Sequence, residues 1–337
     1  MAINWMSLIV FPGLLFILVL NFLTYNFSHL LNNLIWSTQL SNKTHFLVPM
    51  ASYYTLLRNK VKHKDKSKKL LQICCLLGAL FFSLLAALFI PIGLLGVLPE
   101  CCPFSSNLVL GVLTFNGDFL VFFALMFSSN LLLFFCILLN QKISLYTSLK
   151  IFLPYILLDL PILLCLVPFI ISLKTLSISI LVENVQYFVY FNPFFTFFFL
   201  LPCSLLIGLF SIVIKFDHPY FLPPKKEKRF LQNPPISNDW LRVLWDIAIH
   251  LQEFLYITII VTILLGGPHF PIPDLSWNPI FFYALNFSFK VFVLYLVILI
   301  IRSLIPRTPS FLKENITWKI LTPTALLQIL IVAIIII

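Results

Sequence analysis

The sequence predicts an all-α, polytopic integral membrane protein, and three observations support that prediction. Of the 337 residues, 61% are hydrophobic and only 10% are charged, whereas soluble domains carry about a quarter charged residues. Several charge-poor runs reach the roughly 20 residues that a helix needs to cross hydrocarbon. The basic residues gather in loops that would lie on one side of a membrane. This composition argues against a water-soluble enzyme.

Eight charge-poor segments are expected to cross the bilayer and to form a single transmembrane domain over residues 1–337. In chain order they lie near residues 6–30, 70–98, 108–139, 145–173, 186–214, 241–266, 279–302 and 319–337. The second and fifth are the clearest, because their central runs contain no charged residue. The first lacks the basic start and cleavage site of a signal peptide, so we expect it to be retained.

The placement of Lys and Arg predicts the orientation of these segments. All but two of the 22 basic residues lie in or beside the loops after segments one, three, five and seven. The positive-inside rule therefore places these loops in the cytoplasm or matrix and both termini outside. This placement explains the net charge of +10 without a nucleic-acid partner. The basic loops at residues 38–69 and 217–240 are predicted to be docking surfaces for partner subunits.

The seven cysteines are scattered along the chain and give no metal-site spacing. They form no Cys-x-x-Cys pair, and the usual nucleotide-binding and hydrolase motifs are also missing. We therefore expect no metal site and no redox cofactor bound by this chain. A redox role for Cys101 and Cys102 in an outer loop is a lesser alternative.

Three ionisable residues of the sixth segment are spaced to share one helix face. Asp246, His250 and Glu253 lie four and three residues apart, a spacing that brings side chains together on an α-helix. They could form a short proton relay at the inner end of the segment, or they could simply lie in the headgroup region. A metal site is disfavoured, because no fourth ligand is evident.

Asp159 and Lys290 lie within the fourth and seventh segments. Ionisable groups at membrane depth are costly and by default indicate a proton or ion path. Asp159 could instead be a buried carboxylate bonded to a neighbouring helix, since Pro161 loosens the backbone there. Lys290 is too deep for easy snorkelling and needs a carboxylate partner or a wet cavity. The sequence thus predicts a proton path through Asp159, Asp246 and Glu253, with Lys290 as a charge partner.

Six sets of residues follow one another in an order and spacing that resemble a known family. They are Phe22–Tyr25; Pro49 and Ala51; Asn140, Lys142, Lys150 and Asp159; Phe216, Asp217 and Pro219; Leu264–Gly267; and Lys290, Arg302, Pro306, Arg307, Trp318, Lys319 and Pro323. In these motifs the sequence resembles membrane subunit 1 of the proton-pumping NADH:quinone oxidoreductase, complex I. The resemblance extends to the corresponding subunit of formate hydrogenlyase and related membrane-bound hydrogenases.

The resemblance implies a membrane subunit that couples electron transfer to quinone in a peripheral arm with proton translocation. It implies a place for Asp217, Lys150 and Arg302 at the quinone cavity or its interface. It also implies NADH, FMN and iron–sulfur clusters in partner subunits, and contacts with other membrane subunits, peripheral iron–sulfur subunits, quinone and the bilayer. The expected location is a bacterial or archaeal cell membrane or the mitochondrial inner membrane.

Several acidic residues of the family pattern are absent from this chain. Phe27–His29 stands where the family carries Glu-Arg-Lys, the acidic cluster is replaced by the basic Tyr220–Arg229, and Ile249 stands at a Glu position. A structural anchor or ion-path subunit of a hydrogenase complex therefore stays open. An independent transporter is a further alternative, although we find no internal repeat.

Overall fold

The computed structural model describes residues 14–36, 66–91, 93–94, 109–110, 116–139, 153, 155–182, 200–216, 239–267, 279–304 and 315–336. Its principal helices are α2 (Leu14–Trp36), α4 (Lys66–Ala87), α5 (Asp118–Leu138), α7 (Asp159–Leu164), α8 (Val167–Leu173), α11 (Leu201–Phe216), α13 (Asp239–Leu264), α14 (Pro279–Leu304) and α16 (Thr322–Ile336), with the π-helical turn η3 (Thr317–Leu321) before α16. The strands β1 (Gly93–Leu94) and β2 (Val109–Leu110) form one short antiparallel pair. The predicted all-α class is confirmed.

The helices are long and apolar enough to confirm a multi-pass membrane protein. Within the described residues, six helical stretches meet the length and hydropathy of a membrane span: Leu70–Ala87, Asp118–Leu138, Tyr155–Leu173, Val243–Leu264, Ala284–Arg302 and Thr317–Ile335. Two further apolar helices, Leu15–Phe27 and Leu201–Phe216, are shorter and coincide with the first and fifth predicted segments. The count of eight crossings, the outside termini and the single domain stay predictions.

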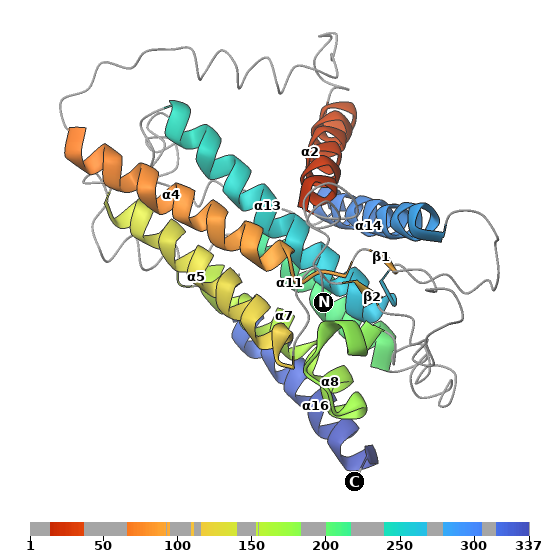
Figure 1. Ribbon diagram of the computed structural model, residues 1–337. Coiled ribbons are helices and arrows are strands. Elements are labelled where there is room, and N and C mark those ends of the chain that lie inside the picture. Colours follow the sequence, from red (N-terminus) through yellow and green to blue (C-terminus); the bar gives the residue numbers. More distant parts are fainter. Residues whose placement is uncertain are drawn as a thin grey trace.

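Helix α13 forms the centre of the bundle. Its span Val243–Leu264 is 89% buried, whereas the other five spans are 28–44% buried. It contacts α2, α4, α11 and α14, and Figure 1 shows it running beside α4, with α5 on the other side of α4. The side chains that α13 presents are therefore the ones that several other helices can reach.

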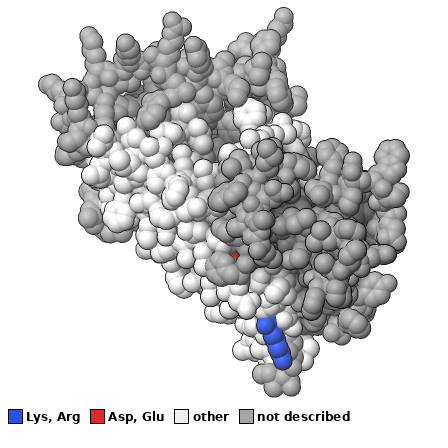
Figure 2. Space-filling model, in the orientation of Figure 1, with Lys and Arg blue, Asp and Glu red and all other residues white. Residues whose placement is uncertain are grey.

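The outer faces of the bundle are apolar. Figure 2 shows one face on which the described side chains are almost entirely uncharged. Large hydrophobic side chains such as Phe81, Phe289 and Ile334 are more than half exposed on α4, α14 and α16. Such surfaces suit lipid or neighbouring transmembrane helices and are unsuited to water.

The second and third predicted segments extend too far, and local residues explain their ends. Helix α4 stops at Ala87 shortly before Pro91, whose ring cannot donate a helical hydrogen bond. Helix α5 begins only at Asp118, after Gly117 with a positive φ of 105°. The residues between these helices contribute the β1–β2 pair, so the expected ranges 70–98 and 108–139 each include non-helical chain.

The fourth segment is interrupted, as its Asp and Pro residues predict. Pro161 and Pro168 each lack the N–H that would bond the carbonyl four residues earlier, at Leu157 and Leu164. The helix accordingly breaks at Leu158 and again after Leu164, which leaves α7 and α8 as separate short helices. The first break places Asp159 at the start of α7, where its side chain can turn toward neighbouring helices.

A π-helical turn packs beside this break. Turn η3 comes just before Pro323, and widening the helix relieves the contact between the proline ring and the preceding turn. Leu321 of η3 forms a small buried cluster with Leu158 and Ile214. These two residues directly precede Asp159 and Lys215 in sequence, so the cluster fixes the backbone that carries both charges.

Candidate functional site

Helix α13 carries polar side chains on two of its faces. Gln252 and Tyr256 lie four residues apart and point toward α5, α7 and α11, where their hydrogen-bond partners lie. His250 and Glu253 lie three residues apart and contact each other, and Glu253 also contacts Arg302 of α14. Because neighbouring residues of a helix are about 100° apart, the two sets face different neighbours. The buried helix thus organises two separate clusters.

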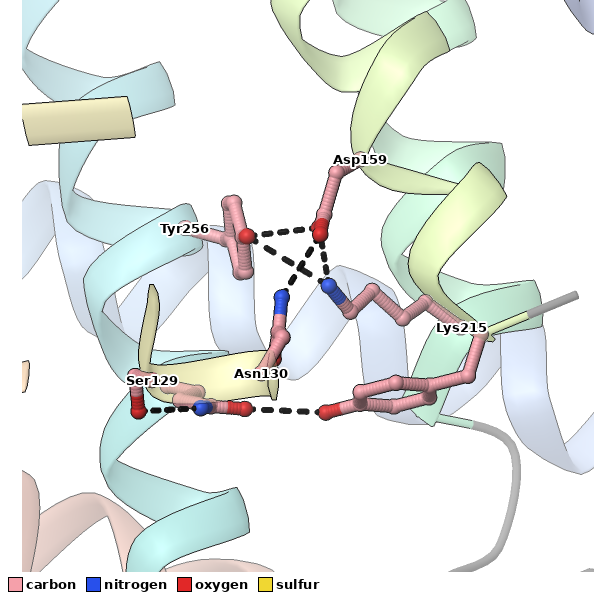
Figure 3. Close-up of polar contacts among 7 residues, drawn as sticks. Ser129, Asn130, Asp159, Lys215 and Tyr256 are labelled. Atoms are coloured by element: carbon pink, nitrogen blue, oxygen red, sulfur yellow. Dashed lines mark hydrogen bonds and ion pairs between the residues drawn. The ribbon is translucent and has the colours of Figure 1, made fainter. Parts of the chain in front are cut away.

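The first cluster is built around an ion pair between Asp159 and Lys215 (Figure 3). Lys215 Nζ contacts Asp159 Oδ1, and the two side chains are 0% and 13% exposed, Lys215 being the sealed one. The Tyr256 hydroxyl donates to the same oxygen at 2.6 Å, and Asn130 Nδ2 donates to Asp159 Oδ2 at 2.6 Å. Lys215 Nζ also donates to the Tyr256 hydroxyl at 3.3 Å. Helices α5, α7, α11 and α13 therefore all converge on one carboxylate.

Aromatic rings enclose the Lys215 ammonium. Its Nζ lies 4.4 Å from the ring centre of Tyr256, 4.5 Å from that of Tyr155 and 5.5 Å from that of Phe216. The Phe216 ring in turn packs against both tyrosines, with ring centres 5.9 and 6.0 Å away. Ring faces attract cations, most strongly where water is excluded. We call Tyr155, Phe216 and Tyr256 the aromatic cage.

A chain of neutral hydrogen bonds holds the cage from the side of α13. The Tyr155 hydroxyl donates to Gln252 Oε1 at 2.9 Å, and Gln252 Nε2 donates to Ser129 Oγ at 2.7 Å. Ser129 Oγ lies 2.9 Å from Ser83 Oγ and donates to the carbonyl of Ala79 at 2.8 Å. These bonds link α13 to α5 and α4, so they fix the orientation of the Tyr155 ring.

The second cluster joins α13 to α14 and α2. Glu253 is 2% exposed, and its Oε1 accepts a hydrogen bond from Arg302 Nη2. His250 Nδ1 lies 3.6 Å from Glu253 Oε2, and the His250 ring packs edge-on against Tyr25, with ring centres 4.5 Å apart. The side chains of His250 and Arg302 are 31% and 19% exposed. This cluster therefore leads from the buried carboxylate toward the surface of the bundle.

The structure places the remaining predicted residues apart from these pairs or outside its described range. Lys290 Nζ donates to the carbonyls of Leu265 and Gly267, at 2.8 and 2.9 Å, beside the C-terminal end of α13. Asp246 lies on the Glu253 face of α13 and is half-buried. Asp217 and Lys150 lie outside the described residues, as does nearly all of the two predicted docking loops.

The prediction from sequence found the carboxylates and missed most of their partners. Lys215 is one of the basic residues that the charge pattern places beside the loop after segment five, but it is completely buried inside the bundle and paired with Asp159. Asn130, Gln252 and Tyr256 are polar residues in apolar helices, and nothing in their local sequence indicates which neighbours they bond. The one available signal is that Lys215 closes a 31-residue uncharged run, Asn184–Ile214, which places it closer to the membrane than the rest of the basic loop.

A further buried carboxylate has a different role. Asp118 Oδ1 accepts a hydrogen bond from the Ile178 backbone N–H at 2.6 Å, and Ser177 Oγ lies 3.4 Å from Oδ2. Asp118 thus caps the backbone that follows α8. Within the described residues, no group of three or more His, Cys, Asp and Glu side chains is placed to hold a metal ion. The charge clusters are organised by protein cations and hydrogen-bond donors.

The fold and these clusters define a polytopic α-helical membrane protein with ion pairs buried between its helices. The family model for NADH dehydrogenase matches residues 42–333, which is most of the sequence. The protein belongs to this family, whose members are of the subunit 1 type of complex I. A search of curated proteins finds no match. The protein is therefore a membrane subunit of the complex I type, in a family that assembles with other membrane subunits.

Proposed function

We propose that this protein is the membrane subunit of a complex I-like NADH:quinone oxidoreductase and takes part in coupling electron transfer to proton translocation. The observation that supports this proposal is the pair of carboxylates, Asp159 and Glu253, that membrane helices hold against Lys215 and Arg302. The family match supplies the type of complex. The buried charges supply a physical reason for a coupling role.

Stability alone is a poor explanation for these charges. An ionised side chain at the centre of a bilayer costs roughly 2.5–3.5 kcal/mol on insertion scales. A buried ion pair is often no more stable than well-packed apolar residues of the same volume. Two such pairs packed around one buried helix are therefore better explained by a function that needs charge inside the membrane.

The two clusters differ in how they could exchange protons. Glu253 is sealed, but His250 and Arg302 beside it are partly exposed, and the two ring nitrogens of an imidazole can accept and donate a proton. Asp159 is itself 13% exposed, whereas its partner Lys215 is not. We infer that protons reach the second cluster through His250 and reach the first directly at the Asp159 carboxyl.

The electron-transfer groups are proposed to lie in partner subunits. NADH, FMN and iron–sulfur clusters would be bound by a peripheral arm, and quinone would be reduced where that arm meets this subunit. Asp217, Lys150 and Arg302 stay proposed residues of the quinone cavity. Stoichiometric iron or zinc in the isolated, folded subunit would overturn the proposal that this subunit carries no redox group of its own.

Substituting the two carboxylates tests the coupling role. Asp159→Asn and Glu253→Gln keep size and polarity but cannot be ionised. In sealed vesicles, both variants should assemble yet form no pH gradient during NADH oxidation, with subunit content checked on the same preparation. Full gradient formation in both variants would contradict a coupling role and leave a structural anchor as the better account.

Purification in mild detergent tests membership of the complex. The proposed function requires iron–sulfur proteins and other membrane subunits to co-purify with this protein and to oxidise NADH. A nickel-containing hydrogenase in place of the NADH-oxidising arm would favour the membrane-bound hydrogenase alternative. A protein that purifies alone and carries ions across reconstituted vesicles would favour an independent transporter.

A further inference from the structure

We propose that Lys215 is a positioning residue for Asp159: a fixed positive charge, held in an aromatic cage, against which the carboxyl binds and releases its proton. This inference rests on the proposed function of Asp159 and adds a residue that the sequence did not indicate. Its observations are the burial of Lys215, the three rings around its ammonium and the shared Tyr256 hydroxyl.

The cage supports the ammonium independently of the carboxylate. Tyr155, Phe216 and Tyr256 place ring centres 4.4–5.5 Å from Nζ, within the range at which ring faces attract cations. The Tyr256 hydroxyl accepts a hydrogen bond from the same ammonium at 3.3 Å. Lys215 therefore keeps favourable contacts as a cation when Asp159 becomes neutral.

The two members of the pair differ in how exposed their side chains are. The Lys215 side chain is 0% exposed, and the three rings and a carboxyl oxygen already face its ammonium, whereas the Asp159 side chain is 13% exposed. A proton that arrives from outside the cluster meets the carboxyl first. In the proposed step a hydronium ion breaks one O–H bond and leaves as water, a new O–H bond forms on Asp159, Lys215 keeps all three of its N–H bonds, and the pair gains one positive charge.

The surroundings of the carboxyl suit both of its protonation states. Asn130 Nδ2 donates to Asp159 Oδ2, while Asn130 Oδ1 is buried and has no hydrogen-bond partner among the described residues. A side-chain amide offers a donor and an acceptor at similar positions, so a rotation of the amide would let Oδ1 accept from a protonated Asp159. That rotation would exchange the bond from Nδ2 to Oδ2 for one from the protonated carboxyl to Oδ1, and it would break no bond at Oδ1.

Three variants separate a fixed charge at Lys215 from a purely structural ion pair and from an amine that gives up its proton. Lys215→Arg keeps a charge that a protein cannot deprotonate, so it should keep at least half of the wild-type gradient in NADH-driven vesicles. Lys215→Met removes the charge and should lower the gradient at least tenfold at equal subunit content. If Lys215→Met does not accumulate, Lys215→Gln replaces it, because its amide still donates to the carboxyl.

Infrared spectroscopy gives a readout that does not depend on pumping. The C=O stretching band of protonated Asp159, identified by its loss in Asp159→Asn, is followed against pH in the purified complex. The midpoint of this titration should equal the wild-type midpoint in Lys215→Arg. In Lys215→Met the midpoint should move by about one pH unit or more, because a neighbouring charge shifts the pKa of a carboxyl group by that much. The titration tests the effect of Lys215 on Asp159 even if Asp159 does not couple proton movement. The coupling role of Asp159 and the positioning role of Lys215 can therefore fail separately.

Two results would overturn the inference. A Lys215→Met complex that pumps normally and titrates at the wild-type pH would make the ion pair purely structural. A Lys215→Arg complex that assembles but neither pumps nor titrates normally would mean that the amine itself must give up its proton.

Discussion

Gln252 is the residue that joins the aromatic cage to the rest of the bundle. Its amide carbonyl accepts from Tyr155 and its amide N–H donates to Ser129. Gln252→Leu keeps the volume but leaves both partners without this bond, so the free energy of unfolding should fall by about 1–3 kcal/mol. Thermal unfolding in detergent measures the change. Thr258→Val on the same helix is the control, because Thr258 bonds only its own backbone at Leu255, and a loss as large as that of Gln252→Leu would contradict the assignment.

Arg302 balances the charge of Glu253, which is only 2% exposed. Arg302→Met removes the guanidinium from the buried carboxylate and leaves it facing the His250 ring at 3.6 Å, so the free energy of unfolding should fall by about 3–5 kcal/mol. Adding Glu253→Gln to the same variant should recover most of that loss. Denaturant unfolding of the single and double variants measures this, and equal losses in the two variants would show that the pair is not coupled.

At the scale of helices, the contact between α11 and α13 determines whether Lys215 meets its partners. Gly208 lies at this contact, where an added Cβ would come within 2.9 Å of Ile260 Cδ1 and 3.3 Å of Cys165 Sγ. Gly208→Val should push the two helices apart and lower the free energy of unfolding by about 1–3 kcal/mol. Leu206→Val, on the exposed face of α11, is the matched control and should change little. A stable Gly208→Val variant would mean that the contact is looser than the structure shows.

The positions of the helices could be predicted from the sequence better than their ends. In the part of the chain that the structure describes, every principal helix overlaps a charge-poor run, and Pro161 beside Asp159 indicated the loosened backbone of the fourth segment. Helix ends were less predictable, because hydrophobicity continues past Ala87 while Pro91 and Gly93 end the helix. Hydropathy reports which residues avoid water, and it carries little information on where the backbone turns.

The site was predictable only in part for a related reason. Glu253 and His250 are close in sequence, so helical spacing indicated their contact. Asp159 and Lys215 are 56 residues apart, and only the packing of α7 against α11 brings them together. A pairing of this kind depends on tertiary structure and leaves no local pattern in a single sequence.

For the whole molecule, we propose that the basic loop at residues 217–240 is the docking surface for peripheral partner subunits. The charges of Lys225, Lys226, Lys228 and Arg229 replace the acidic cluster of the family pattern. Reversing all four to Glu should release the peripheral arm, because opposed charges that guide docking become repulsive. A native gel measures this, with Lys313→Glu in another basic loop as a control. An intact complex after the fourfold reversal would contradict the docking role.

We propose that Asp159 and Glu253, each paired with a cation inside the helix bundle, couple electron transfer to proton movement. Asp118 provides a matched control, because it is also a buried carboxylate but bonds the Ile178 backbone N–H, a role that an Asn oxygen can also fill. The direct measurement is the number of protons moved per NADH oxidised, recorded in the same sealed vesicles for Asp159→Asn and Asp118→Asn. We expect the number of protons moved per NADH to be near zero for Asp159→Asn and equal to the wild-type number for Asp118→Asn. An unchanged ratio in Asp159→Asn, or an equal loss in both variants, would contradict it.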